Sequence, residues 1–380
     1  MRHSSRGEVD PFIVMDVMER ARAAEAAGRR IIHMEVGQPG TPAPAGAREA
    51  LVKAMAEGPL GYTVALGLPE LRAGISDLYL RRYGVDIDPA RIIVTSGSSG
   101  AFLLAFTALF DAGDKVALGD PGYPSYRQIL RALSLEPVGI PTFAEHRLQP
   151  VPEQIPKGIA GLIVASPGNP TGTMLDRPAL TALIEAADVQ GAAFISDEIY
   201  HGIEYDRPAV SALEISDDVY VINSFSKYYS MTGWRVGWMV VPEAHVRLIE
   251  RLAQNMFICP PHASQIAALA ALECDAELQA NLAVYAENRQ LMMEGLPKAG
   301  FTKIAPPDGA FYVYADVADL TRDSLAFAGR ILDEAGVAVT PGLDFDPVRG
   351  GATLRFSYAR ATADIVEGLE RLRDFMARRA

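Results

Sequence analysis

Between residues 91 and 241 the chain alternates short apolar runs with longer segments of helical periodicity. The runs are rich in Ile, Val, Leu and Ala, which is typical of strands buried on both faces. They lie at residues 91–96, 115–120, 158–166, 191–200, 219–222 and 236–241. Because helices separate these strands, the pattern predicts an α/β fold in which a mostly parallel sheet is covered by helices on both faces.

Residues that can bind or react follow the predicted carboxyl ends of several strands. They are Ser98, Tyr123, Asn169, Asp197 and Lys227. The carboxyl ends of parallel strands meet at one edge of a sheet, and ligands of α/β proteins bind beyond that edge. These residues therefore predict one ligand site assembled from segments far apart in the sequence.

Lys227 ends the sequence Ser-Phe-Ser-Lys, which follows the apolar run at 219–222. A lysine at the end of a buried strand loses its charge by desolvation, because lysine is rarely buried without a partner. Its neutral amine attacks carbonyl groups to form Schiff bases. The two nearby serines and Arg235 suit a phosphate group. An imine-forming lysine beside a phosphate site indicates pyridoxal phosphate, although a lysine of a surface loop fits the same spacing.

A glycine and serine turn at residues 97–100 separates the strand at 91–96 from a predicted helix at 101–110. The first turn of a helix has free backbone N–H groups and the positive end of the helix dipole, so this arrangement predicts an anion site. The residues match neither the lysine-bearing P-loop nor the Gly-x-Gly-x-x-Gly pattern. A helix start that is simply capped by serine fits them as well.

The net charge of −12 argues against an extended nucleic-acid surface. The amino-terminal segment MRHSSRGEVDPF lacks the apolar core of a signal peptide, and no run of about 18 apolar residues predicts a membrane span. The only cysteines, Cys259 and Cys274, fit neither a disulfide scaffold nor a metal site. No histidine spacing indicates a metal either. These features together favour a reducing, cytoplasmic location.

The remaining segments are mostly helical up to residue 298, after which short strands and helices alternate. Helices are predicted at 14–28, 45–57, 178–189, 243–298 with a break at 259–261, 323–335 and 362–378. Short strands are predicted at 31–36, 310–317, 337–341 and 352–359. We therefore expect a large ligand-binding domain over residues 41–275, and a smaller α+β domain formed by residues 1–40 and 276–380.

Several motifs occur in a defined order along the chain. They are Ser-Pro-Gly-Asn-Pro-Thr-Gly at 166–172, Ser-Asp-Glu-Ile-Tyr at 196–200, Ser-Phe-Ser-Lys at 224–227 and Arg-Phe-Ser-Tyr at 355–358. In this combination the chain, from Gly37 to Arg355, resembles the class I/II aminotransferases, the aspartate aminotransferase family of fold-type-I pyridoxal-phosphate enzymes. The resemblance implies a large domain with a mostly parallel, seven-stranded-type sheet, a smaller α+β domain, and a homodimer with shared active sites.

The same resemblance implies amino transfer between an L-amino acid and a 2-oxo acid by a ping-pong mechanism, in amino-acid metabolism and biosynthesis. Lys227 would form the internal aldimine with pyridoxal 5′-phosphate, and its freed amine would move the proton at the substrate Cα. Asp197 would keep the pyridine nitrogen protonated. Tyr200 and Asn169 would donate to the phenolate oxygen. A helix cap for Asp197 and a structural turn for Asn169 are the alternatives.

Arg355 would clamp the substrate α-carboxylate at two points, helped by Asn169 and the backbone N–H of Gly37. A structural salt bridge is the alternative for Arg355. The remaining implied cofactor contacts are Ser98, Ser99, Ser224 and Arg235 at the phosphate, Tyr123 against the ring face, and Tyr62 from the other subunit. Ser226 fits either a phosphate contact or the cap of a turn.

The sequence constrains the substrate side chain less strongly. Phe12, Ile13 and Val14 lie in the segment that often closes over the substrate in this family, and their apolar character favours a neutral or aromatic amino donor. Packing against a neighbouring subunit fits them equally well. The sequence Gly-Leu-Asp-Phe-Asp at 342–346 departs from the family's Gly-x-x-Phe-Gly, so Asp346 leaves the specificity open.

Two other functions share these motifs. A β-eliminating C–S lyase, or another lyase of the same fold, would also use Lys227, Asp197 and Arg355. A DNA-binding regulator built on this scaffold would carry a further domain ahead of Gly37, where only a short segment stands here. The lysine and the negative net charge favour an enzyme.

Overall fold

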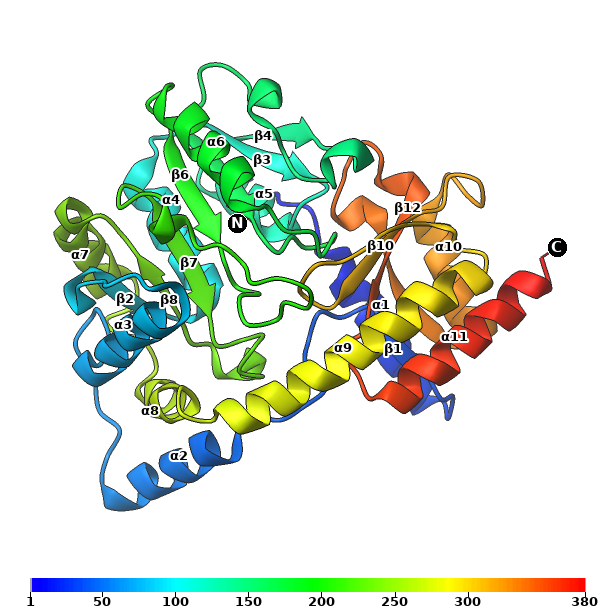
Figure 1. Cartoon of the computed structure of the whole chain (residues 1–380), viewed down its shortest axis with the longest axis horizontal. Helices are drawn as coiled ribbons and strands as arrows, with labels where there is room; N and C mark the ends of the chain where they lie inside the picture. Colours follow the sequence, from blue (N-terminus) through cyan, green and yellow to red (C-terminus); the bar gives the residue numbers. More distant parts are fainter. Residues whose placement is uncertain (1, 380) are drawn as a thin grey trace.

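The computed structural model describes residues 2–379, and its larger sheet has seven strands. From one edge to the other they are β2 (Ile92–Thr95), β8 (Gly237–Val240), β7 (Tyr220–Ser224), β6 (Ala193–Asp197), β5 (Gly161–Ala165), β3 (Lys115–Asp120) and β4 (Glu136–Pro141). Within the described residues, β8 alone runs antiparallel to the other strands of this sheet. The predicted mostly parallel sheet is confirmed (Figure 1).

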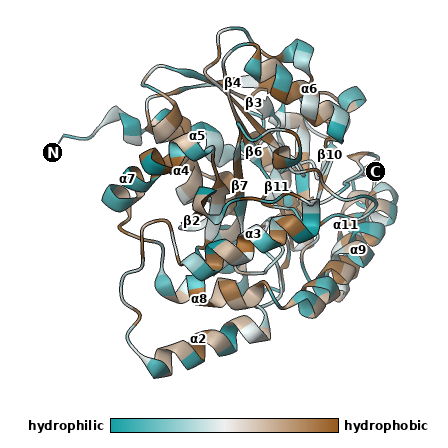
Figure 2. Ribbon diagram, turned by 60° about the vertical axis from the view of Figure 1, so that its left-hand side comes forward, coloured by the Kyte–Doolittle hydropathy of each residue, from teal (hydrophilic) through white to brown (hydrophobic). Residues whose placement is uncertain are grey.

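Helices cover both faces of this sheet. One face packs on α4 (Gly97–Leu109), α5 (Pro124–Ala132) and α7 (Val246–Met256), and the other on α3 (Pro69–Tyr83), α6 (Arg177–Asp188) and α8 (His262–Ala271). Alternate strand residues supply the two cores: in β5, Leu162 and Val164 belong to one and Ile163 to the other. The central strands are therefore largely apolar, as the brown colouring of β7 in Figure 2 shows, whereas the edge strand β4 is mostly exposed.

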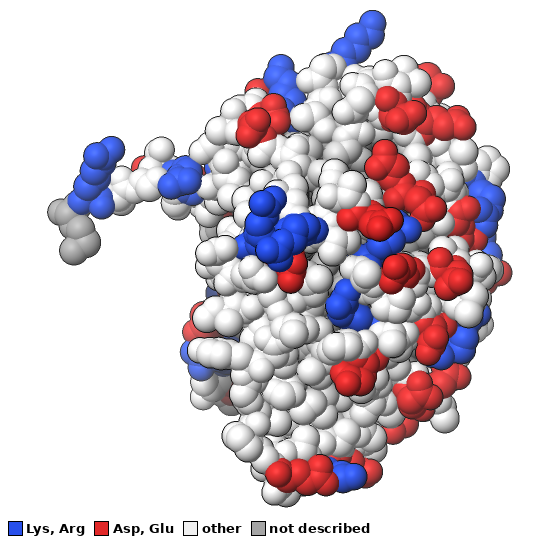
Figure 3. Space-filling view, turned by 90° about the vertical axis from the view of Figure 1, so that its left-hand side faces the viewer, with Lys and Arg blue, Asp and Glu red and all other residues white. Residues whose placement is uncertain are grey.

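Charged side chains are distributed unevenly over the surface. On the face in Figure 3, acidic groups gather on the right, whereas the lower left carries few charges. Exposed apolar side chains include Val52 and Met55 of α2 (Ala45–Glu57), and Tyr62 and Val64 of the loop that follows it. No helix within residues 2–379 is long and apolar enough to cross a membrane.

The smaller sheet has five strands, in the order β1 (Ile32–Met34), β11 (Val337–Pro341), β12 (Thr353–Ser357), β10 (Tyr312–Asp316) and β9 (Lys303–Ala305). Its accompanying helices are α1 (Ile13–Ala26), α9 (Asp275–Lys298), α10 (Ser324–Arg330), the π-helical turn Ile331–Ala335 and α11 (Thr362–Ala377). The 24-residue helix α9 runs from near α8 towards this sheet in Figure 1. α2 packs on α8 at the far end of the molecule.

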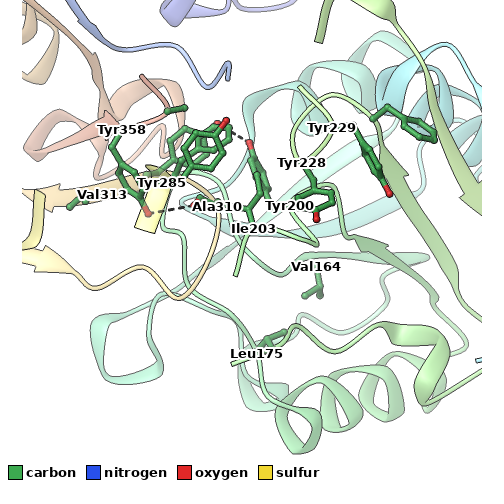
Figure 4. Close-up of a cluster of buried hydrophobic side chains, with 14 of the residues drawn as sticks. Val164, Leu175, Tyr200, Ile203, Tyr228, Tyr229, Tyr285, Ala310, Val313 and Tyr358 are labelled. Atoms are coloured by element: carbon green, nitrogen blue, oxygen red, sulfur yellow. Dashed lines mark hydrogen bonds between the residues drawn. The ribbon is translucent and has the colours of Figure 1, made fainter. Parts of the chain in front are cut away.

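One hydrophobic core continues through both sheets. It contains Val221 of β7 in the larger sheet and Phe356 of β12 in the smaller one. Where the two parts meet, Tyr200 and Tyr285 both contact Phe311, with ring centroids 5.7 and 5.5 Å apart, and Figure 4 shows the tyrosines of this junction. Because the core is shared, the division into two domains stays a prediction.

The structure differs from the sequence prediction at three elements, β4, β9 and α4. The sequence does not predict β4, because Pro137 and Pro141 argue against a strand; at the edge of a sheet, their missing N–H groups are tolerated. The three-residue strand β9, also at an edge, is too short to show a pattern. α4 begins at Gly97 and not at residue 101, so the predicted turn is already the first turn of the helix.

Candidate active site

The carboxyl ends of β2, β3, β5, β6 and β7 open into one cavity with a volume of about 210 Å³. Its lining includes most of the residues singled out from the sequence: Gly37, Ser98, Ser99, Tyr123, Asn169, Asp197, Tyr200, Lys227, Arg235 and Arg355. Segments far apart in the chain thus meet at one edge of the sheet, as the strand-end pattern predicts. Ser224 and Tyr62 are not among the described lining residues.

Lys227 lies in the loop after β7 and points into the cavity. Its Nζ donates a hydrogen bond of 2.6 Å to the carbonyl oxygen of Gly37, and no carboxylate of the described residues lies within 4 Å of it. Burial, reinforced by the positive charges of Arg355 and Arg235, lowers the pKa of Lys227 to about 8. About a tenth of this amine is therefore neutral, and nucleophilic, at pH 7, far more than for an ordinary lysine.

Asp197 ends β6 and is buried at the floor of the cavity. One carboxylate oxygen accepts the backbone N–H of Ile199 at 3.1 Å, and the other accepts the hydroxyl of Tyr126. Burial raises the pKa of Asp197 to about 6, against the effect of these hydrogen bonds. The group is thus ionised at neutral pH, and a cationic ligand nitrogen facing it would be stabilised.

Sequence reasoning missed Tyr126, which lines the cavity from α5. The signal was present: Tyr126 follows Tyr123 by three residues, so both project from the same side of the start of α5. Their rings meet edge to face, with centroids 5.3 Å apart. Tyr126 therefore orients the Asp197 carboxylate while Tyr123 supplies a flat apolar wall.

The first turn of α4 and the guanidinium of Arg235 form one anion-binding corner. Gly97 has φ +72°, and a side chain there would collide with the guanidinium of Arg235. Arg235 Nη1 donates to the carbonyl of Thr232 at 2.8 Å, which fixes the position of the group. Ser98 and Ser99 line the cavity beside it. Helix amides, serine hydroxyls and a guanidinium are the donors that a phosphate group needs.

Ser224 is buried next to the described cavity lining, and its expected contact with a phosphate stays a prediction. Its hydroxyl donates to the carbonyl of Val236 at 3.1 Å and shares a 2.8 Å hydrogen bond with the hydroxyl of Ser226. Ser226, which the sequence left open, lines the cavity instead. Because Ser224 still belongs to β7, its side chain follows the strand and bonds to the neighbouring chain segment.

Arg355 of β12 is 2% exposed and has no carboxylate within 4 Å among the described residues. Its guanidinium lies between the rings of Tyr312 and Phe345, 4.4 and 4.7 Å from their centroids. It donates to the side-chain oxygen of Asn169 at 2.9 Å and to the backbone carbonyl of Glu35, while Nε has no partner. This geometry contradicts the salt-bridge alternative, and such a buried cation favours an anionic ligand.

Tyr312 is a second lining residue that the sequence did not indicate. Its hydroxyl shares a 2.8 Å hydrogen bond with the hydroxyl of Tyr200. A side chain at Gly37 would overlap the Tyr312 hydroxyl, so the glycine lets the tyrosine reach the cavity. Tyr312 comes from the smaller sheet, whose placement against the larger sheet no local sequence pattern reveals.

The mouth of the cavity is apolar. Phe12, Val14 and Met15 line it from the start of α1, and the Phe12 ring meets the edge of Tyr123 at 6.0 Å. Ile13, which was grouped with them, packs away from the cavity against the small core beneath α1. Tyr62 is 83% exposed and is not among the described residues that line the cavity of its own chain.

Comparison with known proteins identifies the family. The family model "Aminotransferase class I and II" matches residues 29–372. The valine–pyruvate aminotransferase of Mycobacterium tuberculosis is 47% identical over 378 residues, which cover 98% of this chain and 97% of that protein. An aspartate aminotransferase of Thermotoga maritima is 34% identical over 95% of this chain and 96% of its own length.

Solved structures agree with this result. The crystal structure of a putative aminotransferase from Silicibacter pomeroyi is 71% identical, with a TM-score of 0.95 and full coverage of both chains. The aspartate aminotransferase from Thermus thermophilus with maleate is 30% identical, with a TM-score of 0.92 over 98% of this chain and 100% of that one. The chain therefore belongs to the class I and II aminotransferases, the aspartate aminotransferase family of fold-type-I pyridoxal-phosphate enzymes, and is a transaminase.

Proposed function

We propose that this transaminase moves the amino group of a neutral, apolar L-amino acid to a small monocarboxylic 2-oxo acid, with valine and pyruvate as the type pair. The charges of the cavity carry this proposal. Its described cations are Lys227, Arg235 and Arg355, and each has a task in the transfer itself. No further lysine, arginine or histidine of the described lining remains for a second substrate carboxylate. The name of the 47% identical relative, valine–pyruvate aminotransferase, agrees with the proposed pair of substrates.

The proposal includes pyridoxal 5′-phosphate as the cofactor, and the donor set of the cavity fits that group. Asp197 would face the ring nitrogen and Tyr123 the ring plane, while Ser98, Ser99, Ser226 and Arg235 would hold the phosphate. Asn169 and Tyr200 would bond the phenolate oxygen. When bound, the cofactor supplies a reactive carbonyl carbon and a ring that takes up electrons from the substrate Cα.

Lys227 would act first as the nucleophile and then as the proton carrier. With a pKa of about 8, its amine can take the proton from the substrate Cα and return it during the same cycle. Arg355 would hold the substrate α-carboxylate by two parallel hydrogen bonds, and Asn169 already fixes one side of that guanidinium at 2.9 Å. The apolar mouth would exclude water while the proton moves.

A homodimer with shared active sites belongs to the same proposal. Tyr62, at 83% exposure, stands outside the cavity of its own chain, in a region where Val52 and Met55 are also exposed. Single exposed apolar residues are ordinary, but a contiguous group of them favours an interface. The proposal also includes a cytoplasmic location and a biosynthetic role in amino-acid metabolism. The cytoplasmic location is supported by the two cysteines, whose spacing does not suit a disulfide scaffold.

The experiment that tests the donor is single-turnover spectroscopy of the purified, cofactor-loaded enzyme. Valine should convert the visible absorbance band to a near-ultraviolet band, and pyruvate should restore it. Aspartate should react at least about tenfold more slowly at equal concentration, since its second carboxylate would be desolvated without a partner. A faster reaction with aspartate would refute the donor assignment. Pyruvate and ammonia released from cystathionine, with no change of band, would favour the lyase.

A further inference from the structure

We propose that Asp344 is a positioning residue for donor specificity: its carboxylate holds the first turn of α1 over the cavity, so that Phe12, Val14 and Met15 form the wall that receives the donor side chain. The proposal rests on the proposed function, because it explains how the same site selects apolar donors. It concerns a residue that never touches the reacting atoms.

The anchor is a pair of buried hydrogen bonds. Asp344 is 5% exposed, and its two carboxylate oxygens accept the backbone N–H groups of Ile13 at 2.9 Å and Val14 at 3.1 Å. These are the first two residues of α1, whose N–H groups have no acceptor within the helix. The N-cap residue, Phe12, has no side chain that could cap them. A carboxylate more than 300 residues away in the sequence therefore takes over the role of the cap.

This anchor determines which face of α1 meets the cavity. Phe12, Val14 and Met15 line the cavity, whereas Ile13 packs into the small core with Val17 on the opposite side. A helix held at its first two amides can neither rotate nor slide without breaking both bonds. Which side chains of α1 face the cavity thus depends on the two hydrogen bonds to Asp344 as well as on the packing of those side chains.

The other end of the segment is tied less firmly. The carboxylate of Asp10 accepts hydrogen bonds from Arg131 at 2.6 Å and Gln128 at 3.2 Å, both on α5. These groups are exposed, and an exposed ion pair contributes little to holding a segment in place. Residues 10–14 therefore cross the cavity mouth from a weak attachment on α5 to a strong one at Asp344, and Figure 1 shows α1 between the two halves of the molecule.

The neighbour of Asp344 links the same loop to the substrate clamp. The ring of Phe345 lies 4.7 Å from the guanidinium of Arg355, and its carbonyl accepts the N–H of Gly122 at 3.1 Å. Gly122 directly precedes Tyr123, which forms the flat wall of the cavity. The loop that contains Asp344 and Phe345 therefore sets the distance between Arg355, which would bind the substrate carboxylate, and the apolar wall. The donor side chain has to fit into this distance.

Asp344→Asn is the direct test, because the amide keeps the shape of the side chain but turns a donor group towards one of the two helix N–H groups. The ratio of kcat/KM for valine to kcat/KM for alanine should fall about tenfold to a hundredfold, mainly through the KM for valine. Alanine is the reference donor because its methyl group offers little surface to the wall. Asp16→Asn, an exposed change of the same charge in the same helical turn, is the matched control and should leave the ratio unchanged.

Hydrogen exchange supplies a readout that needs no turnover. In the cofactor-free protein, the amides of residues 13–14 should lose protection in Asp344→Asn and keep it in Asp16→Asn. Phe12→Ala removes part of the wall and keeps the anchor, so it should lower the valine-to-alanine ratio without changing that protection. Phe12→Ala also tests the wall should Asp344→Asn fail to fold.

Three results would overturn the inference: unchanged protection of residues 13–14 in Asp344→Asn, an equal loss of activity towards valine and alanine in that variant, or an unchanged ratio in Phe12→Ala. Failure of the proposed function looks different. In that case the wild-type enzyme prefers aspartate, while the exchange result for the anchor stands on its own.

Discussion

Arg355 shows how a single side chain can define the ligand of a site. Its guanidinium is 2% exposed, stacked between two rings, and bonded to neutral oxygens only among the described residues. Removing such a cation from water costs several kcal/mol unless an opposite charge compensates it. The bonds to Asn169 and to the Glu35 carbonyl orient the group without neutralising it. An anionic substrate group completes the site electrostatically.

Arg355→Lys should keep the charge and lose the planar fork that bonds both carboxylate oxygens. The kcat/KM for amino acids and for oxo acids should fall about tenfold to a hundredfold, which corresponds to losing one charge-assisted hydrogen bond. Steady-state kinetics measures this loss. The visible absorbance of the bound cofactor is the control, because Arg355 is not among its proposed phosphate ligands. Unchanged kinetics in the variant would place the carboxylate clamp elsewhere.

Lys227 leads to a pH prediction. Burial lowers its pKa to about 8, and only the neutral amine attacks a carbonyl. The rate at which cofactor-free protein captures pyridoxal phosphate should therefore rise with pH through about 8 and level off above it. Stopped-flow absorbance between about pH 6.5 and 9.5 measures this rate.

Lys227→Ala provides the control for that experiment, because it should remain folded and capture no cofactor covalently. Any rate left in this variant reports other lysines and is subtracted. A capture rate that falls with pH across the same range would contradict the assignment of Lys227 as the nucleophile.

At the scale of the elements, the strands of the larger sheet other than β4 were predictable because they are largely apolar runs, and polar residues follow several of them. Parallel strands force those ends together, so the placement of Ser98, Asn169 and Asp197 at one edge followed from topology alone. Tyr312 was not predictable, because it comes from the smaller sheet and no local pattern states how two sheets meet. Asp344 was missed for the same reason: it caps a helix at the other end of the chain.

A pair formed by the partly buried His33 of β1 and the buried Glu35, which follows that strand, makes stability depend on pH. His33 bonds the buried carboxylate of Glu35 at 2.8 Å and the exposed one of Glu25 at 3.1 Å. The hydrogen bond to Glu35 is the main reason that the pKa of His33 rises to about 9. Because the folded-state pKa lies above the unfolded value of 6.5, the stabilisation is complete below pH 6.5 and is lost as the pH rises through 9.

Urea denaturation of the wild type should therefore show a loss of about 1–2 kcal/mol in unfolding free energy between pH 6.5 and 9.5, after allowance for solvent screening of the partly exposed His33. His33→Gln should be less stable than the wild type at pH 6.5 and should lose much less of its stability over the same range. Parallel pH profiles for the two proteins would show that another group causes the dependence.

At the scale of the whole molecule, four of the exposed apolar residues lie on α2 and in the loop that follows it, at the outer end of the molecule. Val52 and Met55 are 69% and 63% exposed, and Tyr62 is 83% exposed. Figures 1 and 2 show α2 packed only at the outer end of the molecule, beside α8. The proposed homodimer would bury this region and carry the hydroxyl of Tyr62 to the phosphate corner of the partner.

Mixed dimers can test whether Tyr62 acts across subunits. Tyr62→Phe alone should weaken cofactor binding by about tenfold, as expected for one hydrogen bond to a charged phosphate. In a heterodimer of one Lys227→Ala chain and one Tyr62→Phe chain, the functional lysine would be paired with the intact tyrosine of the other chain. That site should bind pyridoxal phosphate with wild-type affinity, measured by titrating the visible band. If Tyr62 served its own chain, the only site with a lysine would contain phenylalanine, and the heterodimer would keep the weak affinity of Tyr62→Phe.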